Sequence, residues 1–258
     1  LDIEVAEGKS AAQLEQWIEE FTSELKRLTG RTPMIYTYKY FWMGQMNNSQ
    51  KFSDMPLWLA AYQDQAPEAV GGWKELSFWQ RSGSGKVAGI STDVDMNLFN
   101  GSKQQLQSFS DGNYVDVGGA LEQLVVSDGL DLSSDSTPLI GAILALAAGL
   151  IAIPQLADAA QKSGLDPQAA EGLAGFVKTL KDKDALPVED LGDMAKGNFS
   201  VSDLAILLDN AGHVNNVKSG NVSESEVSEA KNAAKNAGAD VPDFDAAEVA
   251  TLLNRVLQ

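Results

Sequence analysis

Pro33-Met34-Ile35-Tyr36-Thr37-Tyr38 is the stretch that decides the fold of the first region, because this short apolar run is rich in residues that favour strands. A segment with helical spacing precedes it. Its apolar residues stand at positions 14, 17, 18, 21, 25 and 28, which form one stripe of an amphipathic helix. Ser10 can cap the start of this helix and Gly30 its end. A helix followed by a strand is the alternation of an α/β fold.

Further strand-like runs favour the same fold class. They cover residues 1–5, 56–62, 76–80, 86–90 and 93–99. Nearly continuous apolar strands interleaved with helix predict a parallel sheet that is buried on both faces. No strand that would close this sheet is visible in the sequence. We therefore expect a partial (β/α) TIM-like barrel that lacks its first strands, and we interpret the start of the chain as truncated.

The composition of the chain changes near residue 110. Residues 1–110 hold 15 of the 19 aromatic residues and have a net charge of -3, whereas residues 111–258 have a net charge of -14. The polar stretch 108–113 lies at this change. We therefore predict two domains, residues 1–110 and residues 111–258, with their boundary in that stretch.

The second region is rich in Ala, Leu, Asp and Gly, and its spacing is helical. We expect a mostly α-helical domain with helices over residues 118–127, 138–161, 167–181, 201–210, 223–237 and 245–257. Residues 139–153 form an apolar run between Pro138 and Pro154. A membrane-spanning helix needs about 20 apolar residues. A buried helix is therefore the prediction for this run, and a membrane-inserting segment is the alternative.

Charge and rare residues exclude several classes of function. The net charge of -17 would repel the phosphates of nucleic acid, so we expect no nucleic-acid partner. The chain has no cysteine and one histidine, His213, which excludes thiolate and multi-histidine metal sites. The first region has no histidine, so it cannot use Ser-His-Asp catalysis. We expect neither a metal nor a cofactor, and carboxylates remain as the reactive groups.

Asp2 and Glu4 are the candidate reactive pair. Two residues apart on a strand, they point to the same face, with Cα atoms about 6.6 Å apart at roughly 3.3 Å per residue. At such a spacing two carboxyl groups can flank one glycosidic bond, one keeping a proton while the other stays charged. Solvated surface carboxylates are the alternative interpretation of this pair.

Five motifs occur in a fixed order from this pair onward. Asp2-Ile3-Glu4 is followed by Ile35-Tyr36-Thr37 with Phe41-Trp42, by Pro56-Leu57-Trp58-Leu59-Ala60-Ala61-Tyr62, by Phe78-Trp79-Gln80-Arg81-Ser82 and by Val94-Asp95-Met96-Asn97-Leu98-Phe99. The series resembles the glycoside hydrolase family 25 lysozymes, which are N-acetylmuramidases. The resemblance covers residues 1 to about 110 and does not extend into the rest of the chain.

This resemblance implies an enzyme that cleaves the β-1,4 bond between N-acetylmuramic acid and N-acetylglucosamine, outside the cell or at the cell wall, with peptidoglycan glycan strands as its partner. It makes Glu4 the general acid and Asp2 its partner, which stabilises positive charge or orients the N-acetyl group of the substrate. Trp58 and Trp79 also suit the core of a barrel. The implied substrate-binding residues are Asp95, Tyr62, Tyr36, Trp58, Trp79 and Gln80.

The sequence departs from the family in two ways. Arg81 stands where the family commonly has an aromatic residue. The family barrel also begins with about three strands before its Asp-x-Glu motif, so we expect this chain to lack muramidase activity. Two alternatives to an enzyme stay open: a module that binds wall glycan without cutting it, and an interaction or membrane-active protein that works through residues 111–258. The oligomeric state is left open.

Overall fold

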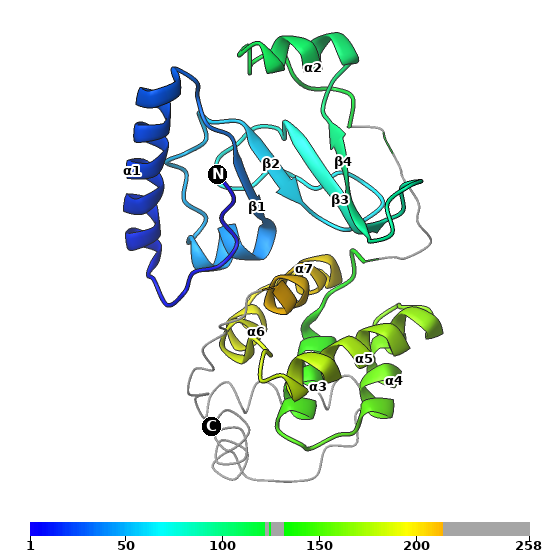
Figure 1. The fold of residues 1–258 in the computed structure, drawn as a ribbon. Coiled ribbons are helices and arrows are strands. Elements are labelled where there is room, and N and C mark those ends of the chain that lie inside the picture. The colour runs from blue at the N-terminus through cyan, green and yellow to red at the C-terminus, as the bar shows by residue number, and fades with distance from the viewer. Residues whose placement is uncertain (122–123, 125–131, 214–258) are drawn as a thin grey trace. The chain divides into compact units, whose positions relative to one another are not determined.

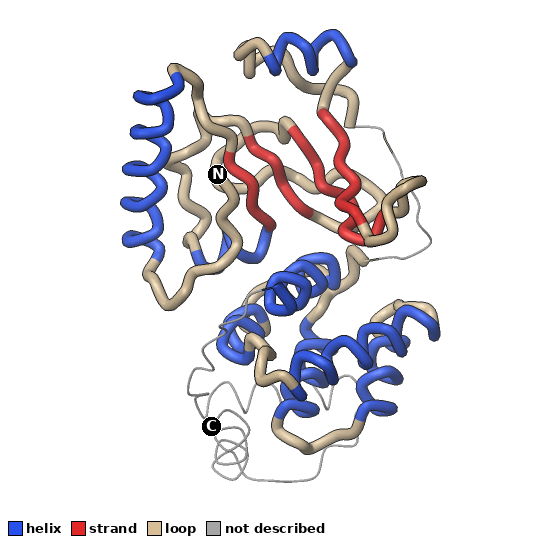
Figure 2. The backbone as a smooth tube through the Cα atoms, viewed as in Figure 1, coloured by secondary structure: helices blue, strands red, loops and turns tan. Residues whose placement is uncertain are grey.

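The computed structural model describes residues 1–121, 124 and 132–213. The chain divides into two compact units, Leu1–Gly129 and Leu130–Gln258. All four strands lie in the first unit, whereas the described residues of the second unit form helices and loops (Figure 2). The α/β fold class predicted for the first region is confirmed.

Helix α1 (Ala11–Thr29) forms where the sequence predicts it. The Ser10 hydroxyl accepts a hydrogen bond from the Gln13 N–H at 3.4 Å, and the Gln13 side chain accepts one from the Ser10 N–H at 3.0 Å, which makes a capping box. The helix ends at Gly30, whose φ of +70° is the left-handed conformation of a helix C-cap. The apolar stripe is divided: Leu14 and Ile18 are buried, whereas positions 17, 21 and 28 are exposed.

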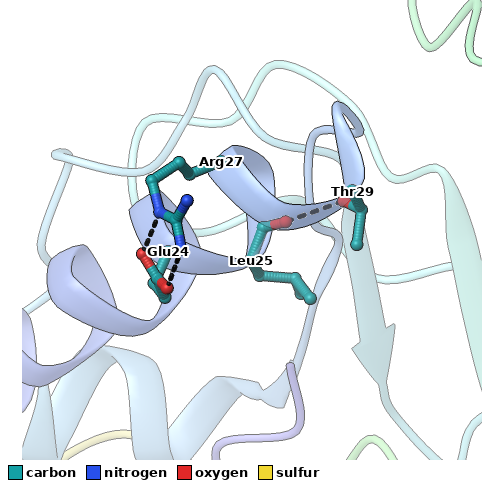
Figure 3. A network of polar contacts seen from close by, with 4 residues as sticks. All are labelled: Glu24, Leu25, Arg27 and Thr29. Carbon is teal, nitrogen blue, oxygen red and sulfur yellow. Dashed lines mark hydrogen bonds and ion pairs between the residues drawn. The ribbon is translucent and has the colours of Figure 1, made fainter.

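The last turns of α1 are tied together by local polar contacts, shown in Figure 3. The Arg27 guanidinium donates two hydrogen bonds of 2.6 Å to the carboxylate of Glu24. The Thr29 hydroxyl donates a hydrogen bond of 2.7 Å to the Leu25 carbonyl, one turn earlier. These are exposed contacts within one helix, and water weakens such pairs. They stabilise the helix itself, whereas its buried residues determine where it packs.

The sheet has the strand order β1-β2-β3-β4 (Figure 1). Its strands are β1 (Ile35–Tyr38), β2 (Leu57–Ala60), β3 (Phe78–Gly85) and β4 (Val94–Phe99). Strands β1, β2 and β3 pair in parallel, whereas β3 and β4 pair antiparallel. The prediction of an all-parallel sheet is therefore wrong for β4. Residues 86–93 join β3 to β4, and a parallel crossover needs about a dozen residues or more. The sequence predicts a strand over 86–90, but these residues belong to the connection and form no strand.

The opening segment lies beside β1 and is less regular than expected. In place of a strand over residues 1–5 there is an isolated parallel bridge between Asp2 and Tyr36. The Ile3 N–H donates to the Tyr36 carbonyl at 3.0 Å, and the Tyr36 N–H donates to the Leu1 carbonyl at 2.8 Å. These bonds place Asp2 and Glu4 next to β1. Along the chain, β1 is followed by the π-helical turn η1 (Phe41–Gln45).

The two faces of the sheet differ in burial. Leu57, Leu59 and Trp79 have no exposed surface and belong to the core, as does Ile35. Their neighbours along the strands, Tyr36 and Trp58 among them, are half-buried and belong to the other face. This alternation follows from the two-residue period of a strand. One face of the sheet therefore carries the core, and the other can carry a site.

Helix α2 (Lys103–Ser110) and the residues after it remain part of the first unit. Phe109 packs its ring edge-on against Phe78 and Phe99, with ring centroids 5.5 and 5.6 Å apart. Tyr114 packs in turn on Phe109 at 4.8 Å. The change of composition near residue 110 thus lies inside the first compact unit, and the division between units falls later, after Gly129.

The second unit contains α3 (Thr137–Ala147), α4 (Ile153–Lys162), α5 (Pro167–Asp182), α6 (Val188–Met194) and α7 (Val201–His213). The single helix expected over 138–161 is two helices, because Gly149 adopts a φ of +75° and Pro154 lies in the first turn of α4. Residues 139–147 are all buried, so the prediction of a buried helix is confirmed for α3. None of the described helices is long and apolar enough to cross a membrane.

Other predictions for this region fare differently. Helices α5 and α7 form close to the expected ranges, and α6 was not expected. The helices expected over 223–237 and 245–257 lie outside the described residues, as does most of 118–127, of which the described residues 118–121 are not helical.

Candidate active site

The half-buried face of the sheet brings most of the predicted site residues together. Asp2 bridges to Tyr36, and Tyr36 is the cross-strand partner of Trp58 on β2. On β3, Gln80 is paired with Asn97 of β4. The opening segment and all four strands therefore each supply at least one residue to this face.

The Tyr36 hydroxyl lies at the centre of this group. It donates a hydrogen bond of 2.7 Å to Oε1 of Gln80. Burial raises the pKa of Tyr36, and the negative charges of Glu4, Tyr62, Asp2 and Asp95 raise it further, in that order. These acidic groups are therefore near enough to Tyr36 to influence its titration.

Asp2 and Glu4 form the acid pair that the sequence predicts. Their side chains are hydrogen-bonded to each other. Loss of water contact through burial raises the pKa of Asp2, whereas the bond to Glu4 and then the charge of the Leu1 amino group oppose this rise. A hydrogen bond between two carboxyl groups needs one proton, which either group can hold. The pair is thus suited to hold one proton between two carboxyl groups.

Gln80 connects the two tyrosines of the site. Only 3% of its surface is exposed, and its Oε1 accepts hydrogen bonds from Tyr36 at 2.7 Å and from Tyr62 at 3.4 Å. The pairing of Gln80 with Ala60 on β2 fixes its backbone in the middle of the sheet. Gln80 therefore shapes the site from beneath and has little surface left with which to bind a ligand.

Trp58 and Trp79, for which the sequence leaves both core and site open, take different places. Trp79 is completely buried, and its indole N–H donates to the Ala61 carbonyl at 2.7 Å. This corrects the expectation that Trp79 contacts a substrate, because a side chain without exposed surface cannot do so. Trp58 stays half-exposed on the site face, packed edge-on against Tyr36 with ring centroids 5.1 Å apart.

Strand β4 closes the site with exposed polar residues. Asp95 and Asn97 alternate with Val94 and Met96, so both project from the same face. Asn97 was missed as a site residue although it stands inside the last motif. Its oxygen accepts a hydrogen bond of 2.8 Å from the Trp58 indole N–H. Its spacing from Asp95 is the feature of the sequence that could have identified it.

The described residues contain no group of three or more His, Cys, Asp or Glu side chains arranged to hold a metal ion. The chemical groups of this face are accordingly the carboxyls, the tyrosine hydroxyls, the amides of Gln80 and Asn97, and the Trp58 ring. Carboxyl groups with an aromatic wall suit proton transfer to a ligand that has both apolar and hydroxyl surfaces.

Comparison with known proteins finds similarity in the first part of the chain. The family described as "Glycosyl hydrolases family 25" matches residues 1–90. The resemblance predicted from the five motifs is confirmed for this segment.

Individual relatives are similar to less than half of the chain. Lysozyme M1 of Streptomyces globisporus is 38% identical over 102 residues, which are 38% of this chain and 34% of that protein. The uncharacterised protein YegX of Escherichia coli O157:H7 is 35% identical over 113 residues, 43% of this chain and 40% of YegX. A solved bacterial lysozyme from Streptomyces coelicolor is 33% identical with a TM-score of 0.42, over 44% of this chain and 55% of that structure. The chain thus spans less than half the length of these two curated relatives.

Proposed function

We propose that the first unit carries a muramidase site, which binds the glycan strands of peptidoglycan and cleaves the β-1,4 bond between N-acetylmuramic acid and N-acetylglucosamine. The observation that carries the proposal is the bridge that sets Asp2 beside Tyr36, on the face of the sheet that also holds Trp58 and Gln80. The family match over residues 1–90 and the relative named as a lysozyme support it.

In this proposal Glu4 is the general acid. It delivers the proton held by the acid pair to the glycosidic oxygen while the glycosidic bond breaks. The leaving sugar departs as an alcohol while positive charge develops on the ring that stays behind. Water then adds to the anomeric carbon of that ring, and its proton returns to the acid pair. A site that supplies this proton avoids forming an unstable alkoxide.

Asp2 is the partner that stabilises this positive charge or orients the N-acetyl group. Burial of its carboxyl group is the largest cause of its raised pKa. The same loss of water contact strengthens the attraction between the carboxylate and a positive charge nearby. Asp2 keeps exposed surface, so it is shielded from water only in part and can still reach a bound sugar.

Asp95, Tyr36, Tyr62 and Trp58 form the proposed surface for the sugar rings. The half-exposed Trp58 ring can stack on the C–H surface of a sugar, while Asp95 is exposed to accept hydrogen bonds from hydroxyl or amide groups. We further propose that the sheet is part of a (β/α) barrel, that the acidic helical domain expected over 111–258 begins after Gly129 instead, and that the protein works at the cell wall.

The test is a comparison of the 258-residue chain with its Glu4→Gln variant on purified insoluble peptidoglycan. Sedimentation measures binding, and mass spectrometry of soluble products identifies new N-acetylmuramic acid reducing ends. If the chain cuts, we expect Glu4→Gln to lower the rate by at least about 100-fold and to leave binding unchanged. Glu20→Gln, an exposed position on α1, is the matched control.

Each outcome separates the hypotheses. Cleavage that depends on Glu4 supports the muramidase, and it contradicts the expectation from sequence that this chain lacks activity. Binding without any cleavage favours the non-catalytic glycan-binding module. A chain that neither binds nor cuts peptidoglycan refutes the proposal.

A further inference from the structure

The Asn97 side chain uses both ends of its amide group. Its Oδ1 accepts the hydrogen bond of 2.8 Å from the Trp58 indole, and its Nδ2 donates to the Asp95 carbonyl at 3.3 Å. An indole N–H can only donate, so the oxygen of the amide must face Trp58. The two contacts therefore fix which way the amide of Asn97 is turned.

The bond from Trp58 to Asn97 spans the sheet. Trp58 lies on β2 and Asn97 on β4, so the indole reaches across β3 to its partner. Two rings hold the other sides of the indole: Tyr36 at 5.1 Å and Phe78 at 5.8 Å between centroids. The rings restrict how far the indole can tilt, and the hydrogen bond selects one rotamer of Trp58.

We propose that Asn97 is a positioning residue for glycan binding, which holds the Trp58 ring as a preset platform for a sugar beside Asp95. The inference deepens the proposed function and rests on it. An exposed aromatic ring that is free to rotate loses this freedom when a ligand stacks on it, which weakens binding. A ring that is already held by Asn97 avoids that loss.

The Asp95 contact adds to this role. Because the amide of Asn97 bonds to the backbone of Asp95, the same residue links the platform to the acidic residue of β4. Replacement of Asn97 is therefore expected to disturb the ring first and the Asp95 backbone second, without any change in the core, because Asn97 is exposed.

The experiment compares the unaltered chain with Asn97→Ala, Asn97→Asp and, as a control at another exposed asparagine, Asn113→Ala. The first readout is the NMR signal of the Trp58 indole N–H, assigned by its loss in Trp58→Phe. In Asn97→Ala we expect this signal to shift and its hydrogen exchange to speed up about two- to tenfold, as for loss of one neutral hydrogen bond. Asn97→Asp keeps an acceptor oxygen and should restore the slow exchange.

The second readout is the affinity for a soluble tetrasaccharide of alternating N-acetylglucosamine and N-acetylmuramic acid. We expect Asn97→Ala to bind it about two- to tenfold more weakly, and Asn113→Ala to bind it unchanged. An unchanged indole signal in Asn97→Ala overturns the inference whatever the affinity. So does a shifted signal with unchanged affinity. If the unaltered chain binds no tetrasaccharide, the proposed function fails and the platform role fails with it, whereas the indole signal still reports whether Asn97 orients Trp58.

Discussion

The Tyr36 hydroxyl donates its one hydrogen to Oε1 of Gln80, so it cannot donate to the carboxyl groups around it. Toward Glu4 and Asp2 the Tyr36 oxygen can act only as an acceptor. An acceptor beside a carboxyl group favours the protonated form of that group over the charged form. Gln80 thereby keeps the Tyr36 hydrogen directed away from the acid pair.

Replacement of Gln80 by Leu removes the oxygen that accepts the hydrogen bond from Tyr36. The Tyr36 hydrogen becomes free to stabilise a charged carboxylate, so we expect the pKa of Asp2 to fall relative to the unaltered chain. We also expect a loss of stability of about 1–3 kcal/mol, because two tyrosine hydroxyls lose a partner that is almost fully buried. Carboxyl NMR titration and urea denaturation measure the two effects. Gln80→Glu retains the acceptor and serves as the comparison, and a Gln80→Leu chain whose Asp2 titrates as before would contradict the argument.

Asp2→Asn tests the pH dependence of stability. The pKa of Asp2 is raised in the folded chain above its usual value, so the folded state binds more protons than the unfolded state in the range between the two values. Stability should therefore fall as pH rises from the unfolded pKa through the folded one. Asp2→Asn should remove this fall. The stability of the variant relative to the unaltered chain should therefore rise from pH 3 to pH 7. Thermal unfolding from pH 3 to pH 7 checks it, and parallel curves for both chains would refute it.

Gly71→Ala and Gly30→Ala form a matched pair. Both glycines have positive φ, +59° and +70°, so both substitutions cost about 1–2 kcal/mol in backbone strain. A Cβ at Gly71 would also lie 2.1 Å from Nε1 of Trp42, whereas a Cβ at Gly30 meets nothing within 4 Å. We therefore expect Gly71→Ala to be less stable than Gly30→Ala by about 1–3 kcal/mol. Urea denaturation gives the difference, and equal losses would show that Trp42 can move away.

Trp79→Phe and Trp58→Phe should separate the core from the site. Trp79 is fully buried with its N–H bonded to Ala61, so its replacement should cost about 1–3 kcal/mol in stability. Trp58→Phe should cost less than about 1 kcal/mol and instead weaken binding to peptidoglycan. Denaturation and sedimentation of both variants measure this. A reversed pattern would mean that the two faces of the sheet are assigned the wrong way round.

Local features of the sequence predicted the elements well. The capping residues and the apolar spacing gave α1 nearly to the residue, and the β-prone runs located β1 and β2. The ordered motifs also predicted that Tyr36 and the acid pair would come together. Each of these predictions depends on interactions between residues close in sequence, or on a pattern preserved across a family.

Properties of the sheet as a whole could not be predicted in the same way. The pairing of Trp58 with Phe78 puts Trp79 on the opposite face, and this register is not visible in either strand alone. The antiparallel direction of β4 depends on the short connection over 86–93, which was interpreted as containing a strand. Asn97 was missed for a related reason, because its partner Trp58 lies two strands away.

Tyr36 holds the acid pair in a second way, through its main chain, because its N–H and carbonyl group bond to Leu1 and Ile3 on either side of Asp2. Fraying of this short segment would carry both carboxyl groups away from the aromatic wall together. The protection of the Ile3 amide against solvent exchange therefore measures how often the proton donor lies beside the surface that would receive a sugar.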